Sequence, residues 1–256
     1  MHILFLTDNF PPEGNAPATR TYEHAKEWVR LGHQVTVITC APNFPEGLLF
    51  KGHKNSWYQR EALDGISVVR VKTYITANEG FVKRILDYMS FGVMGAIAGL
   101  FQKRPDVIVS TSPQFFCACG GWLLSVLRWK PWVFELRDIW PASIMAVGAM
   151  KENTFIKLLE KLELFLYRRA NRIVAGTNSF KTELIARGID GGKIDVVVNG
   201  VDLSTYVPAP VKDPVLAAEY DLMGKFVVGY IGTHGMAHAL DKVLDAAKLL
   251  QWQDDI

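Results

Sequence analysis

Cysteine is scarce in this chain, and its few cysteines are not spaced for a shared role. The 256 residues include three of them, Cys40, Cys117 and Cys119. No pair has the C-x-x-C spacing of a zinc or redox site, and an odd number does not suggest a disulfide framework. We therefore expect three small hydrophobic side chains in a reducing compartment.

An excess of charge of either sign is also missing. Lys and Arg total 28, Asp and Glu total 26, and the two kinds are interspersed. Proteins that bind nucleic acid more often carry a basic face or stripe, so we expect no nucleic-acid partner. His234 and His238 stand four residues apart, but the segment HGMAH lacks the Glu of a zincin motif. We therefore expect no metal site.

No apolar run is long enough to cross a bilayer. The best candidate, 89–101, is shorter than the roughly 20 residues that a hydrocarbon core requires. Lys83-Arg84 and Lys103-Arg104 flank it. Two readings stay open: a core-facing helix with charged ends, or a helix lying on an anionic membrane surface. The amino terminus lacks the basic segment and cleavage site of a signal peptide. We expect a cytoplasmic protein, at the inner face of the plasma membrane under the second reading.

Short apolar blocks rich in β-branched residues alternate with helix-length segments along the chain. This alternation predicts an α/β fold with a Rossmann-like, doubly wound parallel sheet and helices on both sides. The predicted strands are 2–7, 34–39, 66–71, 106–110, 132–135, 172–175 and 194–198. The predicted helices are 16–31, 81–103, 116–128, 154–170 and 179–187. Residues 41–65 contain several Pro and Gly and are expected to form a long loop, functional or disordered.

The composition changes after residue 200 and suggests a domain boundary. We assign a first domain to 1–200, a linker to 201–224 and the start of a second domain to 225–256. Three prolines, Pro208, Pro210 and Pro214, suit a linker. Beyond it, 225–231 is a predicted strand and 237–250 a predicted helix. One strand and one helix cannot bury their apolar faces alone, so we expect the rest of a second domain to be missing from this chain.

Polar and glycine residues follow the predicted strands, where open parallel sheets bind their ligands. They are Asp8, Asn9, Gly14, Asn15, Arg20, Arg137, Asp138, Asn178, Asn199, Gly232 and Gly235. The first loop is rich in proline and lacks G-x-G-x-x-G, which points away from NAD and toward another phosphate-bearing ligand. Gly14 either lets backbone amides approach that phosphate or is an ordinary turn glycine. Arg20 either reaches the same edge of the sheet or is an inert surface residue.

Arg137-Asp138 interrupts an apolar stretch that begins at Trp132. A buried polar pair must be hydrogen-bonded or ion-paired. The pair is therefore either a structural ion pair or helix cap, or a functional pair in which Asp138 orients an acceptor hydroxyl or takes its proton.

Taken in order, several segments resemble the amino-terminal half of a family-4 retaining glycosyltransferase with the GT-B fold. The opening MHILFLTDNFPPEGNAPATRTYEHAKEWVRLGHQVTVIT and the later FELRDIWP, RIVAGTNSFKTELIARG and IDVVVNGVDLSTY are similar to successive features of its first domain. YIGTHGMAHALDKVLDAAKLL resembles the first strand, loop and helix of its nucleotide-binding domain. PPEGN, APNFPEG and ELRDIWP most resemble bacterial transferases of O-antigen and capsule assembly, such as N-acetyl-L-fucosaminyltransferases.

The resemblance implies a hexosyl- or glycosyltransferase that needs no metal or other cofactor. Its donor would be a nucleotide-diphosphate sugar, usually UDP-linked, and its acceptor a polyprenyl-diphosphate-linked saccharide, with the anomeric configuration retained. Peripheral membrane contact would suit such an acceptor. The resemblance implies that Gly14, Asn15, Gly232 and Gly235 lie at the donor phosphates and that Asp138 is catalytic. Contacts to the acceptor or sugar would come from Asp8, Asn9, Arg20, Arg137, Asn178 and Asn199.

The chain departs from the family's pattern in three places. Asn15 stands where a second Gly is common, and no His accompanies Arg137-Asp138. The E-x7-E motif and a phosphate-binding Arg/Lys pair would lie beyond Ile256, so the chain alone is expected to be inactive. Two alternatives stay open: a UDP-sugar 2-epimerase of the same fold, and a non-catalytic binding domain.

Overall fold

A computed structural model describes residues 1–77, 81–140, 153–203, 207, 211–232, 234–235 and 238–253. The described residues fall into two compact units, one that extends to Asn199 and one that begins at Gly200.

The first unit is built on one sheet of eight strands in the order β3-β4-β2-β1-β5-β6-β7-β8. All neighbours are parallel except β3 and β4, which form an antiparallel pair at one edge. The strands are β1 His2–Leu6, β2 Gln34–Cys40, β3 Tyr58–Leu63, β4 Ile66–Val71, β5 Val107–Thr111, β6 Trp132–Leu136, β7 Arg172–Ala175 and β8 Ile194–Val196. The predicted α/β class with a parallel sheet is confirmed.

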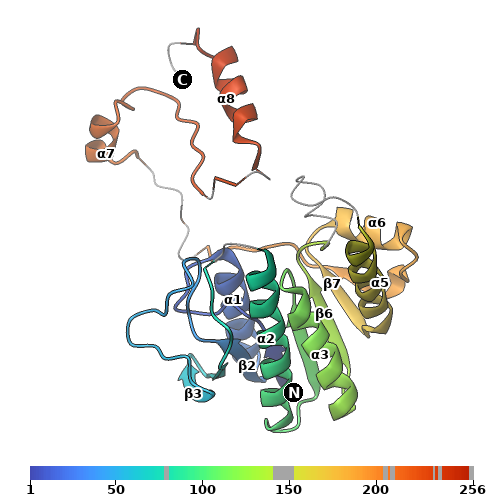
Figure 1. Cartoon of the computed structure of the whole chain (residues 1–256). Coiled ribbons are helices and arrows are strands. Elements are labelled where there is room, and N and C mark those ends of the chain that lie inside the picture. Colours follow the sequence, from blue (N-terminus) through green and yellow to red (C-terminus); the bar gives the residue numbers. More distant parts are fainter. Residues whose placement is uncertain are drawn as a thin grey trace. The chain divides into compact units, whose positions relative to one another are not determined.

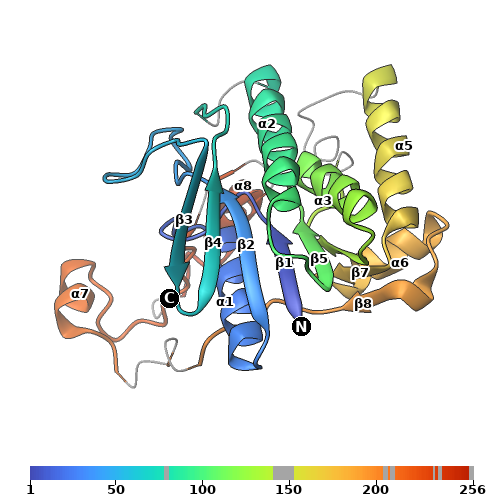
Figure 2. The same cartoon turned by 90° about the horizontal axis from the view of Figure 1, so that it is seen from below.

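Helices cover both faces of this sheet. In the first unit they are α1 Ala16–Arg30, α2 Phe81–Leu100, α3 Phe115–Arg128, α5 Thr154–Arg169 and α6 Asn178–Ala186, with a short 3-10 turn at Gly191–Lys193. α1 packs on one face, whereas α2, α3 and α5 pack on the other (Figures 1 and 2). The second unit contains α7 Pro214–Glu219 and α8 Leu240–Leu249.

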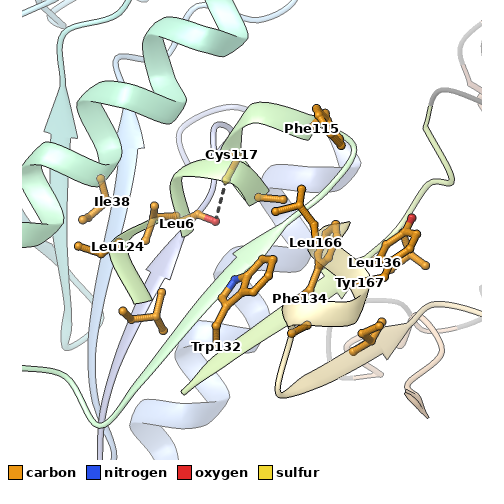
Figure 3. Close-up of a cluster of buried hydrophobic side chains, with 14 of the residues drawn as sticks. Leu6, Ile38, Phe115, Cys117, Leu124, Trp132, Phe134, Leu136, Leu166 and Tyr167 are labelled. Atoms are coloured by element: carbon orange, nitrogen blue, oxygen red, sulfur yellow. Dashed lines mark hydrogen bonds between the residues drawn. The ribbon is translucent and has the colours of Figure 1, made fainter. Parts of the chain in front are cut away.

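The alternation of side chains along β1 creates two separate cores. Ile3 and Phe5 point into the core beneath α1, and Leu4 and Leu6 point into the larger core beneath α2, α3 and α5. Figure 3 shows the larger core, in which Trp132 and Phe134 stack with ring centroids 5.5 Å apart. Fully burying one such aromatic side chain contributes about 2–3 kcal/mol, so these two cores dominate the stability of the first unit.

The three cysteines behave as the sequence predicts. All are free thiols, two of them fully buried and Cys119 partly buried. Cys117 lies in the larger core and donates a weak hydrogen bond from Sγ to the Leu6 carbonyl at 3.3 Å (Figure 3). They are small core residues with no disulfide between them.

α2 and α3 approach each other closely because glycines face each other at their crossing. A Cβ atom at Gly92 would lie 2.4 Å from the Phe116 carbonyl oxygen, and one at Gly120 would lie 2.4 Å from the Gly92 oxygen. Neither position can accept a side chain without separating the helices. The two helices therefore form one rigid layer over the sheet.

The structure differs from the sequence predictions at three places. β3 lies inside the segment predicted as a loop and is joined to β4 through Asp64-Gly65, whose φ angles are 48° and 80°. α7 lies inside the predicted linker. Residues 225–231, predicted as a strand, have no regular structure, since no described strand pairs with them and a strand needs a partner for its backbone hydrogen bonds.

Candidate functional site

The sheet changes its direction of winding between β1 and β5. The chain leaves β1 into α1 on one face, and it leaves β5 into α3 on the other. Open α/β sheets bind their ligands outside the carboxyl ends of the strands at such a point. Nine predicted site residues belong to the first unit and lie between β1 and α1, in the first turns of α1, or after β6, β7 and β8: Asp8, Asn9, Gly14, Asn15, Arg20, Arg137, Asp138, Asn178 and Asn199.

The loop between β1 and α1 is held by two buried ionisable side chains. Arg70 of β4 donates from Nη2 to the Pro11 carbonyl at 2.5 Å. Glu13 accepts the backbone N–H groups of Asn43 and Phe44 at 2.8 and 2.9 Å. The first contact ties the loop to the sheet, and the second ties it to the segment after β2. The loop is therefore fixed by the protein itself.

Asn15 caps α1 and leaves backbone donors unused beside it. Its Oδ1 accepts the N–H of Ala18 at 2.8 Å. The backbone amides of Gly14, Asn15 and Ala16 make no hydrogen bond within the described residues. These donors lie at the positive end of the helix dipole, which favours an anion.

Gly14 is exposed and adjoins open space. Its φ lies outside the left-handed region, and a Cβ atom there would meet no heavy atom within 4 Å. Neither backbone conformation nor packing therefore requires glycine at this position. The open space beside Gly14 adjoins the unused amides of the same turn.

Asp8 is a buried carboxyl at the end of β1. Only 7% of it is exposed, and its Oδ1 makes no hydrogen bond within the described residues. Burial and the nearby Asp87 and Glu13 carboxylates raise its pKa to about 8. Burial also raises the pKa of Asp87 to about 7. At neutral pH Asp8 therefore keeps its proton and can donate a hydrogen bond.

A small cavity of about 40 Å³ opens beside this carboxyl. Its polar lining includes Asp8, Asn9, Asn43, Tyr88 and Gln114. These groups can both donate and accept hydrogen bonds. The cavity can therefore receive a ligand rich in hydroxyl groups.

Glu135 of β6 gathers three basic side chains around it. Arg137 Nη2 lies 2.6 Å and His24 Nδ1 3.2 Å from Oε1, and Arg20 Nη2 lies 3.7 Å from Oε2. Burial by itself raises the pKa of Glu135, but the His24 hydrogen bond and the two arginine charges outweigh it and lower the pKa to about 2. Glu135 is therefore ionised at neutral pH. The two guanidinium groups of Arg20 and Arg137 carry two positive charges against the single negative charge of Glu135. One positive charge is therefore in excess at the carboxyl ends of the strands.

A polar network joins the segments that follow β5, β6 and β8. Ser112, after β5, accepts the backbone N–H of Arg137 at 2.7 Å and that of Asp138 at 3.2 Å. Arg137 Nη1 donates to Asn199 Oδ1, after β8, at 2.9 Å. The structure thus brings together Arg137, Asp138 and Asn199.

Other predicted residues do not join this network. Asn178 begins α6 and is exposed, and it is Thr177 that caps the helix, its Oγ1 accepting the N–H of Phe180. Gly232 and Gly235 belong to the second unit, so their predicted role at the donor phosphates stays a prediction.

The sequence profile of Glycosyltransferase Family 4 matches residues 17–205, about three-quarters of the chain. The chain belongs to Glycosyltransferase Family 4.

Two named relatives of this glycosyltransferase chain come from bacterial polysaccharide and sugar-transfer systems. WcaI of Escherichia coli (strain K12), named as a glycosyl transferase of colanic acid biosynthesis, is 25% identical over 98% of this chain and 63% of its own length. WbjE of Pseudomonas aeruginosa, named as a glycosyltransferase, is 24% identical over 58% of this chain and 38% of its own length. The chain thus spans less than two-thirds of either relative.

Solved structures of HepE share the fold. HepE of Anabaena in complex with UDP-glucose superposes with a TM-score of 0.62 at 17% identity, over all of this chain and 58% of HepE. HepE in complex with UDP gives a TM-score of 0.61 at 18% identity over all of this chain and 59% of HepE. At this identity the likeness establishes the GT-B type of fold.

Three buried ionisable residues near the candidate site cannot be predicted from local sequence patterns. Glu135 and Arg70 lie inside apolar strands, and Glu13 lies among prolines, so no local pattern marks them. An ionisable residue inside a buried strand is itself a signal, because it must find a partner.

Among the residues that the structure describes, no helix is both long and apolar enough to span a membrane.

Proposed function

We propose that the protein transfers a sugar from a nucleotide-diphosphate sugar, UDP-linked, to a saccharide acceptor during assembly of a bacterial surface polysaccharide. One observation carries the proposal: unused amide donors at the amino terminus of α1 adjoin open space at Gly14, at the switch point of a family-4 glycosyltransferase sheet. This is the arrangement that a diphosphate group needs.

The donor diphosphate would bind at α1. The amides of Gly14, Asn15 and Ala16 would donate to its oxygens. Arg20 and Arg137 would supply the excess positive charge. Because amides and guanidinium groups can hold the diphosphate, we expect no metal requirement, and activity should persist in EDTA.

The acceptor would bind in the cavity beside Asp8. Its hydroxyl groups would meet Asp8 and Asn9, and Asp138 would orient the reacting hydroxyl. That oxygen would form a bond to the anomeric carbon as the bond to the UDP oxygen breaks. The leaving diphosphate would take the hydroxyl proton from the same face, so the anomeric configuration would be retained.

The name of WcaI, which refers to colanic acid biosynthesis, supports a polysaccharide product. The UDP-glucose complex of HepE supports a UDP-linked donor. We extend the proposal to a polyprenyl-diphosphate-linked acceptor at the inner face of the membrane, in O-antigen or capsule assembly, with UDP-N-acetyl-L-fucosamine among the donors to test.

The test uses the protein at the full length that its gene encodes. A panel of UDP-sugars is incubated with and without a polyprenyl-diphosphate saccharide, and NMR follows UDP release and the anomer of the product. The proposal requires acceptor-dependent release of UDP with the donor's configuration kept. Inversion of the sugar at C2 without acceptor would instead establish an epimerase. Binding of the acceptor with no turnover of any donor would favour a non-catalytic domain.

A further inference from the structure

The outward face of α2 is apolar along most of its length. From Leu86 onward every exposed side chain of the helix is hydrophobic, namely Leu86, Met89, Val93, Ile97 and Leu100. They recur every three or four residues, so they form one stripe about 20 Å long on the solvent side. A surface helix normally places polar residues there, as α1 does with Thr19, Glu27 and Arg30.

The neighbouring helix repeats this pattern. The exposed side chains of α3 are Leu123, Val126 and Leu127, and the helix has no charged residue before Arg128. The glycine contacts described above hold α3 directly beside α2, and both helices lie on the same side of the sheet (Figure 2). The two exposed apolar stripes therefore belong to one rigid layer, named here the α2–α3 surface.

Aromatic and basic residues stand at the carboxyl ends of both helices. Phe101 is 80% exposed and Trp129 is 87% exposed. Arg128 joins the two ends, donating to the carbonyls of Leu100 at 2.7 Å and Gln102 at 2.9 Å. Exposed aromatic rings beside basic side chains are typical of the boundary between lipid and water.

The charges around the α2–α3 surface are mostly basic. Lys83 and Arg84 precede the α2 stripe, Lys103 and Arg104 follow it, and Lys130 follows α3. The acidic residues of 81–130 are Asp87, which is half-buried beside the cavity, and Asp106, which accepts the backbone N–H of His2. This distribution complements an anionic surface.

We infer that the α2–α3 surface docks on an anionic lipid bilayer, with its apolar stripes among the acyl chains and its basic residues at the headgroups. This inference extends the proposed function, because a polyprenyl-linked acceptor lies in a membrane. Lipid is favoured over a protein partner because apolar stripes, terminal aromatics and basic flanks occur together on one face.

The first experiment changes the apolar part. The full-length protein is sedimented with vesicles of phosphatidylcholine, with and without phosphatidylglycerol. The double variant Ile97→Gln/Leu127→Gln should bind anionic vesicles on the order of a hundredfold more weakly, because two inserted side chains are lost. The control Leu31→Gln/Ile185→Gln, which alters two exposed side chains away from this surface, should bind as the wild type does.

The second experiment changes the charge. Lys103→Gln/Arg104→Gln should weaken binding to anionic vesicles about tenfold or more, whereas Lys26→Gln/Arg30→Gln on α1, on the opposite face, should change it little. Salt at about 0.5 M should remove this difference, because it screens surface charges but not apolar contacts.

Three results would overturn the inference. One is a wild-type protein that does not bind anionic vesicles. Another is equal binding by the Ile97/Leu127 variant and its control. The third is a wild-type oligomer that this variant dissociates in the absence of lipid, which would make the surface an interface between copies. Vesicle binding is measured without donor or acceptor. Sugar transfer by the wild type and the Ile97/Leu127 variant is measured in a further assay, with a water-soluble saccharide in place of the polyprenyl-diphosphate saccharide. Failure of one proposal is therefore distinguishable from failure of the other.

Discussion

Replacing Asp8 with Asn is expected to stabilise the protein at neutral pH. The folded protein raises the pKa of this carboxyl from 3.8 to about 8, so the folded state holds the proton more tightly than the unfolded chain does. Between pH 4 and 8 the unfolded chain ionises Asp8 and the folded protein does not. Stability contributed by this group therefore falls as the pH rises through that range.

The size of the effect follows from the shift. Each pH unit within that window lowers the free energy of unfolding by about 1.4 kcal/mol, so at pH 7 the raised pKa of Asp8 lowers it by about 4 kcal/mol in total. Only 7% of Asp8 is exposed, so solvent screens this cost little. Asn has a similar shape and does not ionise, so the variant should escape the loss.

Urea unfolding at pH 5, 6, 7 and 8 measures this directly. The free energy of unfolding of Asp8→Asn should exceed that of the wild type by a margin that grows with pH, from about 1–2 kcal/mol at pH 5 to about 4 kcal/mol at pH 7. Asp195→Asn, at an exposed carboxyl, is the matched control and should show no such growth. A difference between Asp8→Asn and wild type that stays constant from pH 5 to 8 would refute a protonated Asp8.

Three further substitutions probe the rest of the site. Glu135→Gln leaves buried guanidinium groups without a counter-charge and should lose about 3–5 kcal/mol in urea unfolding at pH 7. The folded protein lowers the pKa of Glu135 from 4.5 to about 2, so the stability that Glu135 contributes is present above pH 4.5 and is lost toward pH 2. The difference in unfolding free energy between Glu135→Gln and wild type should therefore shrink on acidification. A difference that stays constant would count against the ion cluster. Arg70→Met should lower the free energy of unfolding by about 3 kcal/mol and speed amide hydrogen exchange around Glu13. Unchanged exchange would show that Arg70 does not hold the loop. Gly14→Ala should leave the melting temperature unchanged and raise the KM for the UDP-sugar about tenfold, and an unchanged KM would place the diphosphate elsewhere.

The sheet could be predicted from sequence because its signals are local. β1, β2, β5 and β6 are short apolar runs separated by helix-length segments, and burial on both faces requires that composition. β3 was missed because its exposed and half-buried positions alternate and its residues YQREAL are largely polar. The Asp64-Gly65 turn that follows was the available signal.

The ion cluster could not be predicted, because it depends on contacts between distant parts of the chain. Arg20 and His24 on α1 meet Glu135 more than 100 residues later. The sequence predicts ligand-binding roles for Arg20 and Arg137, and no local pattern identifies the carboxylate between them. Such a partner can be identified only from the folded structure, in which Glu135 of β6 lies near the first turns of α1.

Two buried carboxyls near the carboxyl ends of the strands are held in opposite protonation states. The pKa of Glu135 is about 2 because basic side chains surround it, and the pKa of Asp8 is about 8 because burial and other carboxylates surround it. The charge of Glu135 is compensated within the protein by Arg20, His24 and Arg137, although its Oε2 makes no hydrogen bond within the described residues. Asp8 costs stability at neutral pH, and its Oδ1 has no hydrogen-bond partner in the described residues. The two carboxyls therefore differ in charge compensation: basic side chains surround Glu135, and no basic side chain contacts Asp8 among the described residues. In the proposed reaction, Asp8 would bind hydroxyl groups of the acceptor, and the donor's negative charge would bind near the arginines that Glu135 orders.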